Sequence, residues 1–97
     1  MNVLDRMGIN EVYEYGEKVG HLLKRKRHGE DLTKEELLVL ADAADIEYDI
    51  AGRHEAIAKI AADATMKSLS GEAFTDKEIK ATKVMSFMRG RTNGLRD

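Results

Sequence analysis

Apolar residues recur every three or four positions in four separate segments of the chain, which is the spacing of one face of an α-helix. The clearest stripe lies in the first segment and comprises Val12, Tyr15, Val19, Leu22 and Leu23. We therefore predict an all-α fold, a compact bundle of about four helices near residues 10–28, 33–51, 53–69 and 75–89. A short helical turn is also expected at residues 2–7, before Gly8 interrupts the pattern.

Two of the predicted helix starts share a nine-residue pattern, G-E-x-φ-T-x-x-E-φ, in which φ is an apolar residue. The pattern occupies residues 29–37 and again residues 71–79. Thr33 and Thr75 can each act as an N-cap, and the glutamate three residues later can reach back to the N-cap amide, which together form a capping box. The glycine that opens each copy suits the end of the preceding helix. We interpret the repeat as recurrent capping chemistry rather than as a duplicated pair of helices.

The predicted helix at 33–51 is apolar around most of its circumference and polar only along a narrow strip. The polar strip carries four acidic residues, Glu35, Asp42, Asp45 and Asp49. They share one face because spacings of three, four and seven residues return to the same side of a helix. A helix with so little polar surface is expected to be the central element, with neighbours on both flanks. Gly52 permits a bend, so the pattern leaves open whether residues 33–69 form one helix or two.

Two glycines, Gly16 and Gly20, lie one turn apart inside the first predicted helix. Each glycine costs a helix about 1 kcal/mol relative to alanine, so we expect the backbone of another helix to approach closely there. Alanine is dense from residue 41 to residue 64, and these small side chains would complement the glycine pair.

Length and composition fit one domain followed by a short tail. A chain of 97 residues holds one ordinary domain, which we place at residues 1–90. The last helix is expected to stop at Gly90, and residues 91–97, which show no periodicity, are predicted to be a flexible tail. With no cysteine, disulfides and thiolate metal sites are excluded. No apolar run approaches the roughly 20 residues that span a bilayer, and the N-terminus lacks signal-peptide features, so we expect a cytoplasmic protein without a membrane partner.

No constellation of residues in the sequence indicates catalysis. The three histidines lack the spacing of a metal-binding pair, and no glycine-rich phosphate loop is present. The serines lie outside any nucleophile motif. We therefore expect neither an enzyme, nor a cofactor, nor a metal site.

One acidic arrangement is similar to the metal site of a known enzyme family. Glu11-x-x-Glu14 is followed by Asp42-x-x-Asp45, and the all-α nucleotide pyrophosphohydrolases carry E-x-x-E followed by E-x-x-D. The resemblance implies Mg²⁺ held by carboxylate oxygens on facing helices. Asp42 stands where that family has glutamate, and the lysine and further acids around such sites are missing. Mg²⁺-dependent nucleotide hydrolysis is therefore the remote alternative for this chain.

Two features favour protein binding. The acidic strip could meet a basic partner, and the methionines and alanine faces could serve a helix-on-helix interface, including one between two copies of the chain. We therefore predict a small protein-binding regulatory module of the adaptor or inhibitor type. It would act through the acidic helix face or through helix packing, with a homodimer as one form.

Nucleic acid is the alternative partner, although the net charge of −2 provides no general attraction to it. The basic residues gather near helix ends and comprise Lys24, Arg25, Lys26, Arg27, Arg89 and Arg91. Such cations can grip phosphates without reading bases, which gives binding that is indifferent to sequence. If the first and last helices are neighbours, the two groups of cations would merge into one surface.

Overall fold

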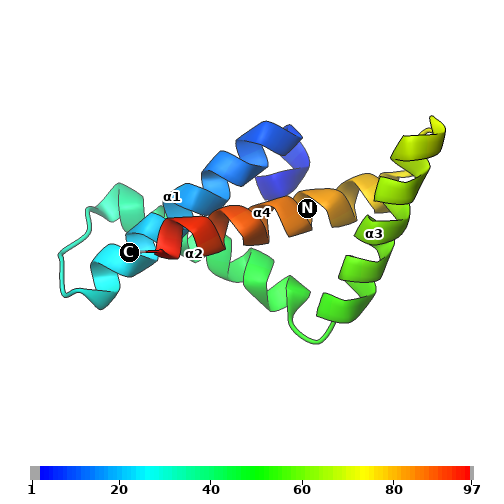
Figure 1. The fold of residues 1–97 in the computed structure, drawn as a ribbon. Helices are drawn as coiled ribbons and strands as arrows, with labels where there is room; N and C mark the ends of the chain where they lie inside the picture. The colour runs from blue at the N-terminus through cyan, green and yellow to red at the C-terminus, as the bar shows by residue number, and fades with distance from the viewer. Residues whose placement is uncertain (1–2, 97) are drawn as a thin grey trace.

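The structure, a computed structural model, describes residues 3–96, and over that range it is built from helices alone. A 3-10 turn (Val3–Arg6) is followed by α1 (Ile9–Arg27), α2 (Lys34–Ile50), α3 (His54–Ser70) and α4 (Asp76–Leu95), as Figure 1 shows. The predicted all-α bundle of four helices with a short N-terminal turn is therefore confirmed. Residues 2 and 97, which belong to the predicted segments 2–7 and 91–97, lie outside the described residues.

The segment 33–69 forms two helices rather than one. Gly52 takes the left-handed backbone conformation with φ +78°, which residues with a Cβ atom rarely adopt. Arg53 Nε donates to the backbone oxygen of Asp49 at 2.8 Å and so binds a carbonyl in the last turn of α2. The chain therefore turns at Gly52, and α3 runs in a new direction, away from α2 and toward the start of α4 (Figure 1).

Helices α1 and α4 lie side by side and run in the same direction, so their C-terminal ends meet at one end of the molecule (Figure 1). Tyr13 faces Gly90, and Glu17 faces Gly94 one turn further along both helices. A Cβ atom added to either glycine would lie less than 3.0 Å from a backbone oxygen of α1. The two backbones are therefore in direct contact, with no room for a side chain between them.

The predicted close approach at Gly16 and Gly20 is confirmed, but its partner differs from the expected one. A Cβ atom at Gly16 would clash with the backbone of Phe87, and one at Gly20 would clash with the backbone of Arg91. The contact is thus made by α4 and not by the alanine-rich stretch 41–64. Helix α4 is the partner because it also carries glycines, Gly90 and Gly94, so at each contact one of the two helices lacks the Cβ atom that would hold the backbones apart.

The prediction that Gly90 stops the last helix is wrong, and so is the flexible tail where it covers residues 91–95. Gly90 is buried inside α4, which continues to Leu95. Packing on α1 offsets the cost that glycine imposes on an isolated helix. Asn93 Nδ2 also donates to Glu17 Oε2 at 2.8 Å, which ties the last turns of α4 to α1.

The hydrophobic core lies where the 3-10 turn, α1, α2 and α4 meet. Its buried side chains are Leu4, Val12, Val19, Ala43, Ile46, Ile50, Val84 and Phe87. The Phe87 ring is fully buried and packs against the Tyr15 ring, with 5.7 Å between the ring centroids. Of the two apolar faces of α2, the one with Ala43 and Ile46 is buried, whereas the one with Tyr48 stays exposed.

The prediction that the 33–51 helix is the central element is wrong. Helix α4 is central, because it contacts α1, α3 and the 3-10 turn, whereas α2 packs mainly on α1. Leu38 of α2 is 62% exposed and Tyr48 is 83% exposed. The apolar excess of this helix is therefore not satisfied within the described part of the chain.

Both predicted capping boxes are present. Thr33 Oγ1 accepts a hydrogen bond from the Glu36 amide, and Thr75 Oγ1 accepts one from the Glu78 amide. Each glutamate side chain in turn accepts from the backbone amide of its threonine. The starts of α2 and α4 are thus determined by local chemistry that the sequence carries twice.

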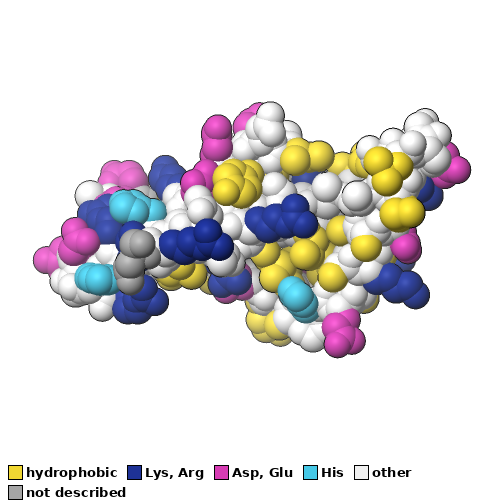
Figure 2. Space-filling model, viewed as in Figure 1, with side chains coloured by type: hydrophobic (Ala, Val, Ile, Leu, Met, Phe, Trp, Pro, Cys, Tyr) yellow, Lys and Arg dark blue, Asp and Glu magenta, His cyan; other side chains and the backbone are white. Residues whose placement is uncertain are grey.

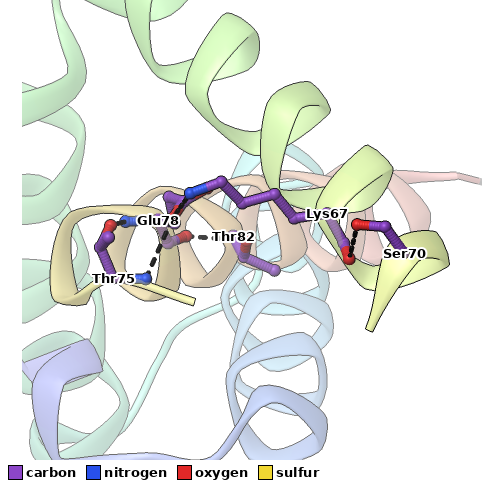
Figure 3. Close-up of polar contacts among 5 residues, drawn as sticks. All are labelled: Lys67, Ser70, Thr75, Glu78 and Thr82. Carbon is purple, nitrogen blue, oxygen red and sulfur yellow. Dashed lines mark hydrogen bonds and ion pairs between the residues drawn. The ribbon is translucent and has the colours of Figure 1, made fainter. Parts of the chain in front are cut away.

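Each capping-box glutamate also binds a cation that lies eleven residues earlier, in the preceding helix. Arg25 Nη1 donates to Glu36 Oε2 at 2.5 Å, and Lys67 Nζ donates to Glu78 Oε1 at 2.9 Å, as Figure 3 shows for the second pair. The repeated pattern therefore includes this cation. In each of the two connectors, an ion pair thus joins the end of one helix to the start of the next.

The Glu78 carboxylate makes stability depend on pH. Its pKa lies below the usual glutamate value of 4.5, first because the Thr75 amide donates to it and then because Lys67 does. A lowered pKa in the folded state stabilises the fold above the pKa of the unfolded chain, and this stabilisation is lost as pH falls through the folded value.

We therefore expect the free energy of unfolding to fall as pH drops below about 4.5, and to fall less steeply in Glu78→Gln. Urea unfolding monitored by circular dichroism between about pH 7 and about pH 3 measures both slopes. Glu36 has a lowered pKa for the same reasons, so part of the slope should remain in the variant. Equal slopes in the two proteins would contradict the role of Glu78.

Candidate functional site

Three of the four predicted acidic residues line one surface pocket of about 500 Å³, which we call the aspartate pocket. Its lining residues are Val3, Arg6, Asp42, Asp45, Tyr48, Asp49 and Lys80. Glu35 is exposed nearer the start of α2 and does not line it. The structure thus brings the predicted strip together over the second half of α2 and adds residues from the 3-10 turn and from α4.

The aspartate pocket is not uniformly acidic, because Arg6 and Lys80 offset part of its negative charge. The charge of Asp42 also acts on Tyr15 of α1, because burial and then this charge raise the pKa of Tyr15 to about 12. The phenol donates to the backbone oxygen of Val39 at 3.4 Å, which fixes its position. Because Arg6 and Lys80 lie beside the aspartates, the pocket presents charges of both signs to a partner.

The carboxylates that resemble a pyrophosphohydrolase site are not brought together as a metal centre. Glu11 and Glu14 of α1 do not line the pocket that holds Asp42 and Asp45. Among residues 3–96, no group of three or more histidine or acidic side chains has a geometry that could hold a metal ion. The resemblance therefore receives no support from the arrangement of these side chains.

Two of the six predicted phosphate-binding cations are engaged with carboxylates of the chain itself. Arg25 binds Glu36 and lies 3.6 Å from Glu30, and these carboxylates raise its pKa. Arg91 Nη1 lies 2.7 Å from Glu47 Oε1 and so links α4 to α2. Sequence reasoning missed these roles because Glu36 and Glu47 lie on another helix, α2.

The remaining four cations are exposed or partly exposed, but they do not form one group. Lys24 Nζ donates to the backbone oxygen of Arg96 at 2.8 Å, so the C-terminal ends of α1 and α4 do meet. Lys26 and Arg27 lie exposed at the same end, where Figure 2 shows lysine, arginine, histidine and acidic side chains intermixed. Arg89 lies elsewhere, in the groove described next.

A groove of about 400 Å³ between α3 and α4 is the least polar of the larger surface hollows, and we call it the α3–α4 groove. It is lined by Ala58, Ala61, Ala62, Thr65, Met66, Met85 and Arg89. Figure 2 shows hydrophobic side chains gathered over the angle between these helices. Met66 is 67% exposed and Leu69, further along α3, is 80% exposed. The alanine and methionine content was the sequence signal for a helix interface, but only the structure places these residues together.

The α3–α4 groove continues along α4. A second hollow of about 380 Å³ shares Met85 and Arg89 with it and adds Tyr13 and Met88. A smaller one of about 150 Å³ joins Met88 to Ile50 at the end of α2. A partner segment lying on α4 would therefore contact apolar side chains from several helices.

Comparison with models of protein families, with curated proteins and with solved structures finds no match to this chain. Within residues 3–96, none of the helices has the length and apolar character needed to cross a membrane. The candidate function therefore rests on the surfaces described above.

Proposed function

We propose that this chain is a small cytoplasmic protein-binding module of the adaptor or inhibitor type, which packs a helix of its partner into the α3–α4 groove. The observation that carries the proposal is the groove itself, in which three alanines of α3 face Met85 of α4. Soluble chains rarely leave connected apolar hollows exposed without a binding role.

The residue types in the α3–α4 groove suit a helical partner. Alanine side chains let a second helix approach α3 closely, because they add little bulk between the two backbones. Met66 and Met85 are flexible and polarisable, so they can adjust to the shape of an apolar partner face. Arg89 at the rim supplies a positive charge that a partner carboxylate can meet.

The groove is a better candidate than the aspartate pocket or the basic helix ends. The aspartates are exposed and have cations among them, so they gain little by binding a basic partner. Of the basic residues, Arg25 and Arg91 already hold internal carboxylates. The groove instead offers apolar area whose removal from water stabilises a complex directly.

Site-specific photocrosslinking tests the proposal. Benzoylphenylalanine introduced at Met66, whose side chain is mostly exposed, should form a defined adduct with a protein in cells that contain the chain. Ala62→Arg, which places a long charged side chain in the groove, should lower the adduct yield about tenfold or more. The matched control Ala56→Arg changes an exposed alanine of α3 outside the groove and should leave the yield unchanged.

The same experiment separates the groove from the aspartate pocket. Asp42→Lys combined with Asp49→Lys reverses two charges of that pocket and should leave the adduct unchanged. If the double variant loses the adduct while Ala62→Arg keeps it, the acidic face is the binding surface. If the folded protein forms no protein adduct at Met66, the proposal is wrong.

A further inference from the structure

The side chains on the groove face of α3 become larger along the helix. Its first half carries Ala58, Ala61 and Ala62, whereas its second half carries Met66 and Leu69. A second copy of α3 that crosses the first in the antiparallel direction near Ala61 would place Ala61 and Ala62 of the two helices against each other, so their backbones could approach closely there.

The charged side chains beside this face could form ion pairs with the same side chains of a second, antiparallel copy of α3. Glu55, Lys59 and Asp63 follow one another at four-residue spacing and alternate in sign, and all three are exposed. If a two-fold axis crosses α3 near Ala61, Lys59 of one copy lies level with Asp63 of the other, and the symmetry repeats the pair. Lys67 is excluded from this set because it binds Glu78 within its own chain.

We infer that the helix received by the α3–α4 groove is α3 of a second copy of this chain, packed antiparallel about a two-fold axis near Ala61 and Ala62. This inference rests on the proposed function, because it names the partner of the same groove. The contact is isologous, so each copy supplies one groove and one helix. One helix pair with its flanking side chains is smaller than a standard interface, so we expect a dissociation constant on the order of 10 μM.

Sedimentation equilibrium of the purified chain over a concentration series tests the dimer. We expect a monomer–dimer equilibrium in the wild-type protein and a dissociation constant about tenfold or more higher in Ala62→Arg, because two arginines would meet near the axis. Ala62 is exposed within one chain, so circular dichroism should show unchanged helicity in this variant. Ala41→Arg changes an exposed alanine of α2, away from the groove and from the charged side of α3, and should dimerise like the wild type.

A charge exchange tests the antiparallel arrangement. Lys59→Glu alone and Asp63→Lys alone each bring like charges together twice across the axis, so each should weaken its homodimer about tenfold. An equimolar mixture of the two variants restores opposite charges at both positions and should form a heterodimer about as tight as the wild-type dimer. A mixture that is no tighter than either variant alone would overturn the antiparallel pairing.

The failure of this inference can be told apart from failure of the proposed function. If the wild-type chain is monomeric at concentrations up to about 200 μM, the second copy is not the partner. An adduct at Met66 with a different protein, lost in Ala62→Arg, would then still support the groove as a binding site. If the chain is monomeric and no adduct forms in cells, both are wrong.

Discussion

Gly90→Ala is expected to lower the free energy of unfolding by about 3 kcal/mol, although alanine is the better helix former by about 1 kcal/mol. The new Cβ atom would lie less than 3.0 Å from the backbone oxygen of Tyr13 and near the Glu17 amide nitrogen. Backbone atoms cannot turn aside as a flexible side chain can, so α1 and α4 would have to separate. Urea unfolding monitored by circular dichroism measures the loss.

Gly8→Ala is the matched control for this substitution. Gly8 precedes α1 with an ordinary extended backbone, φ −74° and ψ 167°, and the nearest atom to an added Cβ there is Glu11 Oε1 at 3.7 Å. The stability should therefore change by less than about 1 kcal/mol. If Gly90→Ala were as stable as Gly8→Ala, the two backbones would not be in direct contact.

Phe87→Ala is expected to lower the free energy of unfolding by about 4 kcal/mol, because it removes a fully buried ring from the centre of the core. The Tyr15 ring, 5.7 Å away between centroids, would lose its aromatic neighbour. The hole would lie between α1, α2 and α4, where the helix backbones cannot all move inward. Thermal and urea unfolding both report this loss.

The only other phenylalanine, Phe74, provides the control. It is half-buried in the connector before α4, outside the core cluster. Phe74→Ala should therefore cost about 1 kcal/mol or less. Equal losses for Phe74→Ala and Phe87→Ala would mean that the core is not centred on Phe87.

The close contact between α1 and α4 also explains why a groove remains on the other side of α4. Phe87, Gly90 and Gly94 face α1, so α4 turns Met85 and Arg89 away from it. Helix α3 could cover these residues only by lying along α4. It instead leads away from the core after the turn at Gly52, which leaves the hollow between them open (Figures 1 and 2).

Local chemistry explains which features could be predicted from the sequence. The capping boxes at Thr33 and Thr75 formed as expected, because a capping box needs only residues within one turn of each other. The inward stripe of α1 was also correct, since helical period alone places Val12 and Val19 on one face. The need for a close neighbour at Gly16 followed from the cost of glycine in a helix.

Tertiary packing decided which residues from different helices contact each other. The sequence determined that the fold is all-α, where three of the helices begin and end to within a residue or two, and that Gly16 and Gly20 meet another backbone, but it left open whether residues 33–69 form one helix or two. Only the structure showed that this backbone belongs to α4, that Arg91 binds Glu47, and that alanines of α3 face Met85. The physical reason is that a glycine, an arginine or an alanine has the same local preferences wherever its partner lies. Its role is determined by a residue far along the chain, which helical period and capping do not reveal.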